Sequence, residues 1–172
     1  MKLLMITAAL AAVAAAPAFA QGQAQTPPCQ EKIFHDFDFW IGDWEVFDPQ
    51  GAKAGENAIT REEYGCLLLE RWTSAQGTTG QSYNFVDHIT GKWRQVWVSA
   101  GATIDYAGGL NDKGQMVLEG TIGYPTGVKA PFRGTWTPNE DGTVTQSFQQ
   151  FDPEKKQWND WFTGLYRRKA AP

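Results

Sequence analysis

Residues 37–46, FDFWIGDWEV, decide the fold of this chain. An aromatic cluster opens the stretch. Gly42 follows it, at a point where a glycine allows the tight backbone turn that leads into a strand. From Trp44 onward the side chains alternate between two faces, as they do in a β-strand. The stretch therefore predicts a short aromatic turn or helix followed by the first strand of a sheet.

Short alternating runs separated by turn motifs continue through the rest of the chain. From Trp44 onward no window of roughly 12 residues shows the 3.6-residue period of an amphipathic helix. The turn motifs begin with Asp or Asn and most contain Gly, as hairpin turns do. They lie at residues 48–51, 87–91, 111–114, 139–142 and 152–154. We expect about ten strands, near residues 44–48, 54–63, 67–75, 80–87, 92–99, 102–109, 115–123, 131–137, 143–151 and 157–168.

The predicted fold class is all-β, an antiparallel meander that closes into a barrel. Closure removes the sheet edges that so many short strands would otherwise expose. A closed sheet of about ten strands leaves an interior that side chains alone need not fill. A ligand cavity is therefore expected inside the barrel.

Four motifs resemble a bacterial family of exported lipocalin-like domains whose function is unassigned. They are FDFWIGDWEV, GCLLLERW at residues 65–72, GKWRQVWV at residues 91–98 and the closing GLYRRK at residues 164–169. In lipocalins and their calycin relatives, a Gly-x-Trp opens the first strand, and its Trp plugs the closed end of the barrel beneath an Arg of the last strand. The resemblance implies a lipocalin-like barrel that is closed by Trp44 and Arg167. It implies no activity.

The first 20 residues have the pattern of a secretory signal peptide. Lys2 is their one charge, an apolar run rich in Leu and Ala follows, and the segment ends in Ala-Phe-Ala. The apolar run is too short and too rich in alanine to indicate a membrane span. Residues 21–32, rich in Gln, Pro and Ala, predict a flexible arm, and residues 33–172 predict a single domain. We expect a periplasmic or secreted protein.

The charge balance gives no support for a nucleic-acid or membrane partner. The chain carries a net charge of −4. Cleavage after residue 20 would remove one Lys and leave 14 basic and 19 acidic residues. Nucleic acids and anionic membranes both need basic patches on their partner. The oligomeric state stays open.

Two cysteines, Cys29 and Cys66, lie beyond the predicted signal peptide. An exported protein meets an oxidising compartment, so a disulfide between them is the first interpretation. It would close a loop of about 37 residues, worth roughly 4 kcal/mol in the chain-entropy model. The rival interpretation, a metal or redox pair, lacks the ligand spacing and the partners of a zinc site.

The two histidines do not suggest a cofactor. His35 lies in the aromatic arm and His88 lies in a predicted hairpin turn, so neither stands on a strand that would direct it into the barrel. Haem-binding barrels hold their iron through an inward side chain, for which only a Tyr could substitute here. No serine sits in a nucleophile elbow. We expect neither a metal nor a cofactor.

Two carboxylates carry the hypothesis of catalysis. Glu70 shares a strand face with Trp72, and Asp105 lies in a strand among apolar and small residues. A carboxylate held among aromatic rings has its pKa raised by desolvation and can act as a general acid or base. The alternative is that both acids face water, where Arg71 and Arg94 can pair with them.

The aromatic residues give the strongest functional signal, because all eight tryptophans follow residue 20. An aromatic wall with a few amide or hydroxyl groups suits a small apolar or ring-shaped ligand, and would also suit stacking on a sugar. Alternation alone leaves open which strand faces point inward. The predicted ligand-binding residues are Trp72, Tyr83, Gln95, Trp97, Trp136, Gln146, Trp161 and Tyr166.

Three functions are compatible with this pattern. The leading one is an exported protein that binds a small hydrophobic or ring-shaped molecule without a cofactor. The first alternative is a metal-free isomerase, cyclase or hydrolase whose acid or base is Glu70 or Asp105. The second is an interaction or inhibitor module with a filled core, which would lack a cavity and expose an apolar patch instead.

Overall fold

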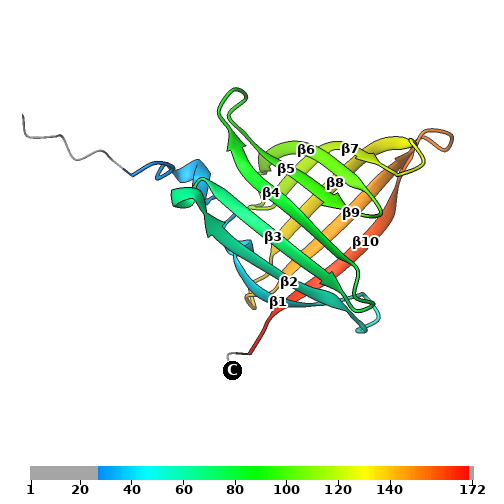
Figure 1. The fold of residues 1–172 in the computed structure, drawn as a ribbon, viewed down its shortest axis with the longest axis horizontal. Helices are drawn as coiled ribbons and strands as arrows, with labels where there is room; N and C mark the ends of the chain where they lie inside the picture. The colour runs from blue at the N-terminus through cyan, green and yellow to red at the C-terminus, as the bar shows by residue number, and fades with distance from the viewer. Residues whose placement is uncertain (1–26, 171–172) are drawn as a thin grey trace, which may run out of the picture.

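Ten antiparallel strands close into a barrel in the computed structural model, which describes residues 27–170 (Figure 1). Each strand pairs with the next along the chain, and β1 pairs with β10 to close the sheet. The predicted all-β meander is thereby confirmed. The strands are β1 (Gly42–Phe47), β2 (Lys53–Glu62), β3 (Leu67–Ser74), β4 (Thr79–Asp87), β5 (Lys92–Ser99), β6 (Thr103–Leu110), β7 (Met116–Gly123), β8 (Lys129–Pro138), β9 (Val144–Asp152) and β10 (Gln157–Arg168).

Three short 3₁₀ helices complete the described chain. They are η1 (Lys32–His35), η2 (Asp38–Trp40) and η3 (Glu63–Gly65). The predicted signal peptide, residues 1–20, lies outside the described residues, as does the first half of the predicted arm, residues 21–26. No helix within residues 27–170 is long and apolar enough to cross a membrane.

The hairpin turns form where the sequence motifs placed them. The side-chain oxygen of Asp48 accepts a hydrogen bond from the backbone N–H of Gln50 at 2.9 Å. Asp87 accepts one from Ile89 at 2.8 Å, and further along the chain Asp152 accepts one from Glu154 at 3.0 Å. Such bonds mimic a backbone turn and stabilise the change of direction.

Helices η1 and η2 plug one end of the barrel. Phe37 and Trp40 are fully buried there, with their rings stacked at 4.9 Å between centroids. Phe37 also meets the ring of Trp93 edge-on at 5.6 Å. Trp44 is also fully buried and donates a hydrogen bond from Nε1 to the Trp40 carbonyl at 2.9 Å. The aromatic stretch that begins the domain therefore closes this end of the barrel.

The arginine that covers Trp44 is Arg168, and the expectation that Arg167 does so is wrong. The Arg168 guanidinium lies 3.9 Å from the centre of the Trp44 ring. Arg168 is the direct cross-strand partner of Trp44, whereas Arg167 is paired with Glu45. Since successive residues of a strand point to opposite faces, a shift of one residue moves the arginine to the other side of the sheet. Arg167 packs over Phe47 instead.

Gly42 makes room for this arginine. Its φ is +137°, and a Cβ at this position would lie 1.7 Å from Nη1 of Arg168. The same nitrogen donates a hydrogen bond to the Ile41 carbonyl at 2.5 Å. A glycine is thus favoured here by the backbone angle, and its missing side chain leaves the space that the guanidinium occupies.

Cys29 and Cys66 form a disulfide, as predicted. It ties the segment before η1 to the residue that follows η3, between β2 and β3. The connection it anchors is strained, because Glu63 and Tyr64 both have positive φ. The disulfide therefore fixes the chain that carries the aromatic plug to the rim of the barrel.

The two ends of the barrel differ because the strands alternate in direction. The β2–β3, β4–β5, β6–β7 and β8–β9 connections lie at the plugged end. The other five hairpins surround the opposite end, which we call the mouth. The mouth is where a ligand can enter.

Candidate functional site

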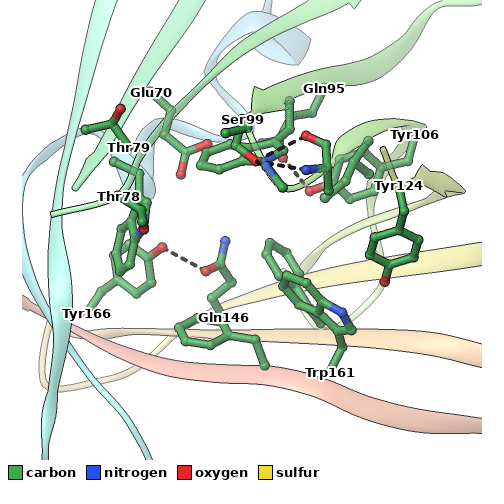
Figure 2. Close-up of a pocket in the computed structure, with 18 of the residues that line it drawn as sticks. Glu70, Thr78, Thr79, Gln95, Ser99, Tyr106, Tyr124, Gln146, Trp161 and Tyr166 are labelled. Carbon is green, nitrogen blue, oxygen red and sulfur yellow. Dashed lines mark hydrogen bonds between the residues drawn. The ribbon is translucent and has the colours of Figure 1, made fainter. Parts of the chain in front are cut away.

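A cavity of about 650 Å³ lies inside the barrel and reaches the hairpins of the mouth (Figure 2). Aromatic side chains make up a large part of its wall. The aromatic lining residues are Trp72, Trp97, Tyr106, Tyr124, Phe148, Trp161, Phe162 and Tyr166. Glu70, Gln95 and Gln146 supply buried polar groups. The interaction-module alternative predicts a filled core, and this cavity contradicts that prediction.

Inward-facing glycines keep this space open by letting tryptophan rings lie against the wall. A Cβ at Gly80 on β4 would lie 2.2 Å from the ring of Trp97 on β5. A Cβ at Gly55 on β2 would lie 2.7 Å from the ring of Trp72 on β3. Each ring therefore covers a neighbouring strand where a side chain is missing. The large tryptophans line the cavity without filling it.

A β-bulge adds a further ring at the mouth. The β9–β10 pairing shifts between Asp160 and Phe162, so that Trp161 lies opposite no single residue. Trp161 and Phe162 both line the cavity, although adjacent residues of a regular strand face opposite ways. The Trp161 ring contacts Phe132 edge-on at 5.5 Å, and the side chain is 48% exposed. It therefore stands between the cavity and solvent.

Glu70 lies at the polar base of the cavity, with only 4% of the residue exposed. One carboxylate oxygen accepts a hydrogen bond from Ser82 Oγ at 2.5 Å, and the other accepts one from Asn57 Nδ2 at 2.7 Å. Asn57 also donates to Tyr166 Oη at 3.1 Å. Tyr166 in turn donates to Gln146 Oε1 at 2.7 Å, as the dashed line in Figure 2 shows.

The network continues from Ser82 in the other direction. Asn84 Nδ2 donates to Ser82 Oγ at 2.8 Å and to the Leu68 carbonyl at 3.0 Å. Gln95 donates to Asn84 and accepts from the hydroxyl of Tyr106. One chain of hydrogen bonds thus runs from Tyr106 through Glu70 to Gln146. Such connected buried groups hold one another in a defined orientation.

Burial raises the pKa of Glu70 to about 7, against the opposing effect of the hydrogen bonds from Ser82 and Asn57. The pKa values of Tyr106 and Tyr166 are raised well above their ordinary range, first by burial and then by the charge of Glu70. At neutral pH the tyrosines are therefore uncharged, while both the protonated and the ionised form of Glu70 are populated.

Six of the eight predicted ligand-binding residues line the cavity. They are Trp72, Gln95, Trp97, Gln146, Trp161 and Tyr166. Trp136 does not. It is fully buried deeper in the barrel, between Phe37 and Tyr106. Tyr83 is 52% exposed on the outer face of β4, because Ser82 and Asn84 take the inward positions.

The expectation that Asp105 is held among aromatic rings in the cavity is wrong, because this residue lies on the outer face of β6. Its carboxylate accepts two hydrogen bonds from the guanidinium of Arg94, at 2.8 and 2.6 Å. These hydrogen bonds lower the pKa of Asp105. The arrangement matches the alternative prediction for this acid, a surface ion pair. Glu70 is the acid that the fold brings into the cavity.

Asn57, Ser82 and Asn84 were not identified from sequence, although they orient Glu70. A usable signal was present in β4, where Gly80, Ser82 and Asn84 share one face. That face is polar, yet it points into the barrel. Phe148 and Phe162 were missed as well. The first is an inward residue of β9, and the second depends on the bulge.

Both histidines lie at the plugged end. His35 Nδ1 lies 2.9 Å from a carboxylate oxygen of Asp38, and the ring of His88 packs at 6.1 Å from that of Phe34. Neither lines the cavity. Within the described part of the chain, no three His, Cys, Asp or Glu side chains are grouped so as to hold a metal ion.

No family model matches this chain, and a search of curated proteins finds no match. Membership of the exported lipocalin-like family therefore stays a prediction that rests on the four sequence motifs. The barrel has the architecture that the resemblance implies, but one barrel architecture serves many functions.

Proposed function

We propose that this protein binds a small hydrophobic or ring-shaped molecule in the barrel cavity. The observation that carries the proposal is the cavity itself, about 650 Å³ in volume, with an aromatic wall and a few buried polar groups at its base. Ligand sites in proteins have this size and this composition. No cofactor is needed for such binding.

The lining is held in place before any ligand arrives. The rings of Trp72 and Trp97 rest against glycines, and the hydrogen-bond network fixes Glu70 and Tyr166. A site that is already ordered loses little conformational entropy when it binds, which favours affinity. The arrangement supports a site built for a ligand of defined shape.

We also propose that the protein is exported, to the periplasm or beyond the cell, and that it belongs to the lipocalin-like family described above. The disulfide between Cys29 and Cys66 supports export, since such bonds persist in oxidising compartments. The signal-like pattern of residues 1–20 supports it independently.

Native mass spectrometry of protein isolated from the cells that make it tests the binding function. We expect an added mass that disappears on denaturation. An Ala102→Trp variant should lose that mass, because Ala102 lines the cavity and is only 8% exposed. Thr103→Trp is the matched control, since Thr103 is the next residue and is exposed. A bare mass, or an added mass that survives Ala102→Trp, contradicts the proposal.

The state of Glu70 favours a second candidate, a metal-free isomerase, cyclase or hydrolase. A carboxylic acid with a pKa of about 7 inside an aromatic cavity suits general acid or base catalysis at neutral pH. If the protein is an enzyme, the bound molecule that denaturation releases should be converted to a new compound when it is added back to folded protein. Glu70→Gln should slow that conversion by roughly 10² or more. Cargo that is recovered unchanged leaves binding as the function.

A further inference from the structure

The charge of the cavity restricts what it can hold. Among the described residues that line the cavity, Glu70 is the only ionisable one apart from tyrosines. The lining contains no Lys, Arg, His or Asp from this part of the chain. Any charge on a bound ligand is therefore balanced by Glu70 alone. A buried charge without a partner is costly, so the sign of the ligand's charge matters.

Glu70 has hydrogen-bonding capacity left for a ligand. A carboxylate can accept about four hydrogen bonds, and Glu70 accepts one on each oxygen, from Ser82 and from Asn57. Figure 2 shows the carboxylate directed into the space that Tyr166 and Gln146 also face. A donor on the ligand can therefore reach the free side of the acid.

The surroundings of Glu70 favour a cation over a neutral donor. Trp72 lies two residues along the same face of β3 and lines the cavity beside the acid. The face of an indole ring attracts an ammonium group. A carboxylate in a ligand would instead meet Glu70 at short range in a medium of low polarity, with no basic side chain to offset the repulsion.

We propose that the natural ligand is a hydrophobic amine, whose protonated amino group binds the Glu70 carboxylate while its apolar part packs against the aromatic wall. This inference rests on the proposed binding function and narrows it to one class of ligand. Fatty acids and other hydrophobic anions bind most weakly, because they are repelled by the ionised form of Glu70. Neutral ring-shaped molecules bind more weakly than amines of the same skeleton.

Binding of such an amine is coupled to the proton on Glu70. The titratable groups that face Glu70 are Tyr106 from β6 and Tyr166 from β10, and both stay neutral at physiological pH. The groups from β2 and β4 are Asn57 and Ser82, which carry no charge. Below about pH 7, the acid must release its proton before it can pair with the ammonium group. The affinity for the amine therefore rises with pH and levels off above the pKa of Glu70.

Three fluorescent probes that share one ring system test the inference. They are 1-pyrenemethylamine, 1-pyrenemethanol and 1-pyrenecarboxylate. Energy transfer from the protein's tryptophans to pyrene reports binding in each case. At about pH 8 we expect the amine to bind at least tenfold more tightly than the alcohol, and the carboxylate to bind most weakly. Between about pH 5.5 and pH 8 the affinity for the amine should rise about tenfold or more, while the affinity for the alcohol stays constant.

Glu70→Gln supplies the variant test. It should weaken amine binding at least tenfold, leave alcohol binding within about threefold, and abolish the pH dependence. Glu119→Gln is the matched control, because Glu119 is an exposed acid paired with Arg133. If Glu70→Gln does not fold, the pH profile of the unaltered protein decides the question alone.

The outcomes separate this inference from the function on which it rests. Equal affinity for all three probes, or tightest binding of the carboxylate, overturns the amine inference and leaves a cavity that binds hydrophobic molecules. A failure of all three probes to bind overturns both. An amine preference that persists in Glu70→Gln also overturns the inference, because the selectivity then has another source.

Discussion

Glu70 and Tyr166 share one hydrogen-bond donor, the side-chain amide of Asn57, whose Nδ2 lies 2.7 Å from Glu70 Oε1 and 3.1 Å from Tyr166 Oη. The amide oxygen of Asn57 is buried and has no partner within the described chain. If the amide turned over, that oxygen would face Glu70 and accept a hydrogen bond from its protonated form. Asn57 is thus suited to both protonation states of the acid.

The stability of the protein should depend on pH through Glu70. Its pKa is about 7 in the folded chain and has its ordinary value of 4.5 when the chain is unfolded. Between these values the folded state binds more protons than the unfolded state, so the free energy of unfolding falls as the pH rises. The full loss is roughly 3 kcal/mol and is complete above about pH 7.

Urea denaturation of the protein and of Glu70→Gln, from about pH 4.5 to pH 8, measures this term. The difference between the two isolates Glu70 from other titrating groups. One of these is Glu56, an exposed acid whose hydrogen bonds with Lys169 and Lys53 lower its pKa to about 2. The unaltered protein should lose stability relative to Glu70→Gln as the pH rises. A difference that does not vary with pH would show that Glu70 keeps an ordinary pKa.

Removing the disulfide should cost roughly 4 kcal/mol of stability, because the bond closes a loop with a sequence separation of 37 residues. A Cys29→Ser/Cys66→Ser variant, compared with the oxidised protein in a urea titration, checks this figure. The reduced form of the unaltered protein should match the double variant. A midpoint that is the same in all three forms would show that the plug holds without the bond.

The contact between Arg168 and Trp44 predicts that the two neighbouring arginines are not equivalent. Arg168→Leu removes a cation–π contact and a hydrogen bond to the Ile41 carbonyl, so it should cost about 1–2 kcal/mol. Arg167→Leu is the comparison; it removes only the longer cation–π contact with Phe47, at 4.9 Å, and should cost less, about 0.5 kcal/mol. Thermal unfolding of both variants measures the difference. A larger loss of stability in Arg167→Leu than in Arg168→Leu would mean that Arg167 is the residue that closes the barrel.

Gly80→Ala should narrow the cavity without touching its polar base. The added Cβ would lie 2.2 Å from the ring of Trp97, so the ring must move. We expect a changed near-ultraviolet circular dichroism spectrum and weaker binding of 1-pyrenemethanol. Gly109→Ala is the control, because no atom lies within 4 Å of the position of its Cβ. Unchanged binding in Gly80→Ala would show that Trp97 does not limit the space for a ligand.

The alternation of side chains was sufficient to predict the strands, but not which of their faces points inward. Trp72 and Trp97 were expected in the cavity because an aromatic wall suits a ligand, and on β3 and β5 the inward face does carry aromatic side chains. The same reasoning failed for Tyr83 because the buried network reverses the usual pattern on β4. There polar side chains point inward, and Tyr83 points to solvent.

The remaining errors come from information that alternation does not contain. The aromatic character of Trp136 predicts an inward position but not its depth along the barrel axis, and the residue belongs to the plugged half. Phe162 follows a bulge, and a single extra residue reverses the faces beyond it. The hydrogen-bond network spans strands that are far apart in sequence, and its members are recognisable only once those strands are neighbours.

The meander has a consequence for how the chain folds. Every strand pair joins sequence neighbours except β1 and β10, whose pairing runs only from Trp44 with Arg168 to Phe47 with Leu165. Hairpins close fast because little chain entropy is lost in each, whereas this last pairing must bring the two ends of the domain together. The seam between β1 and β10 is therefore expected to form last. The packing of Arg168 on Trp44 is then among the last contacts to form in the native state.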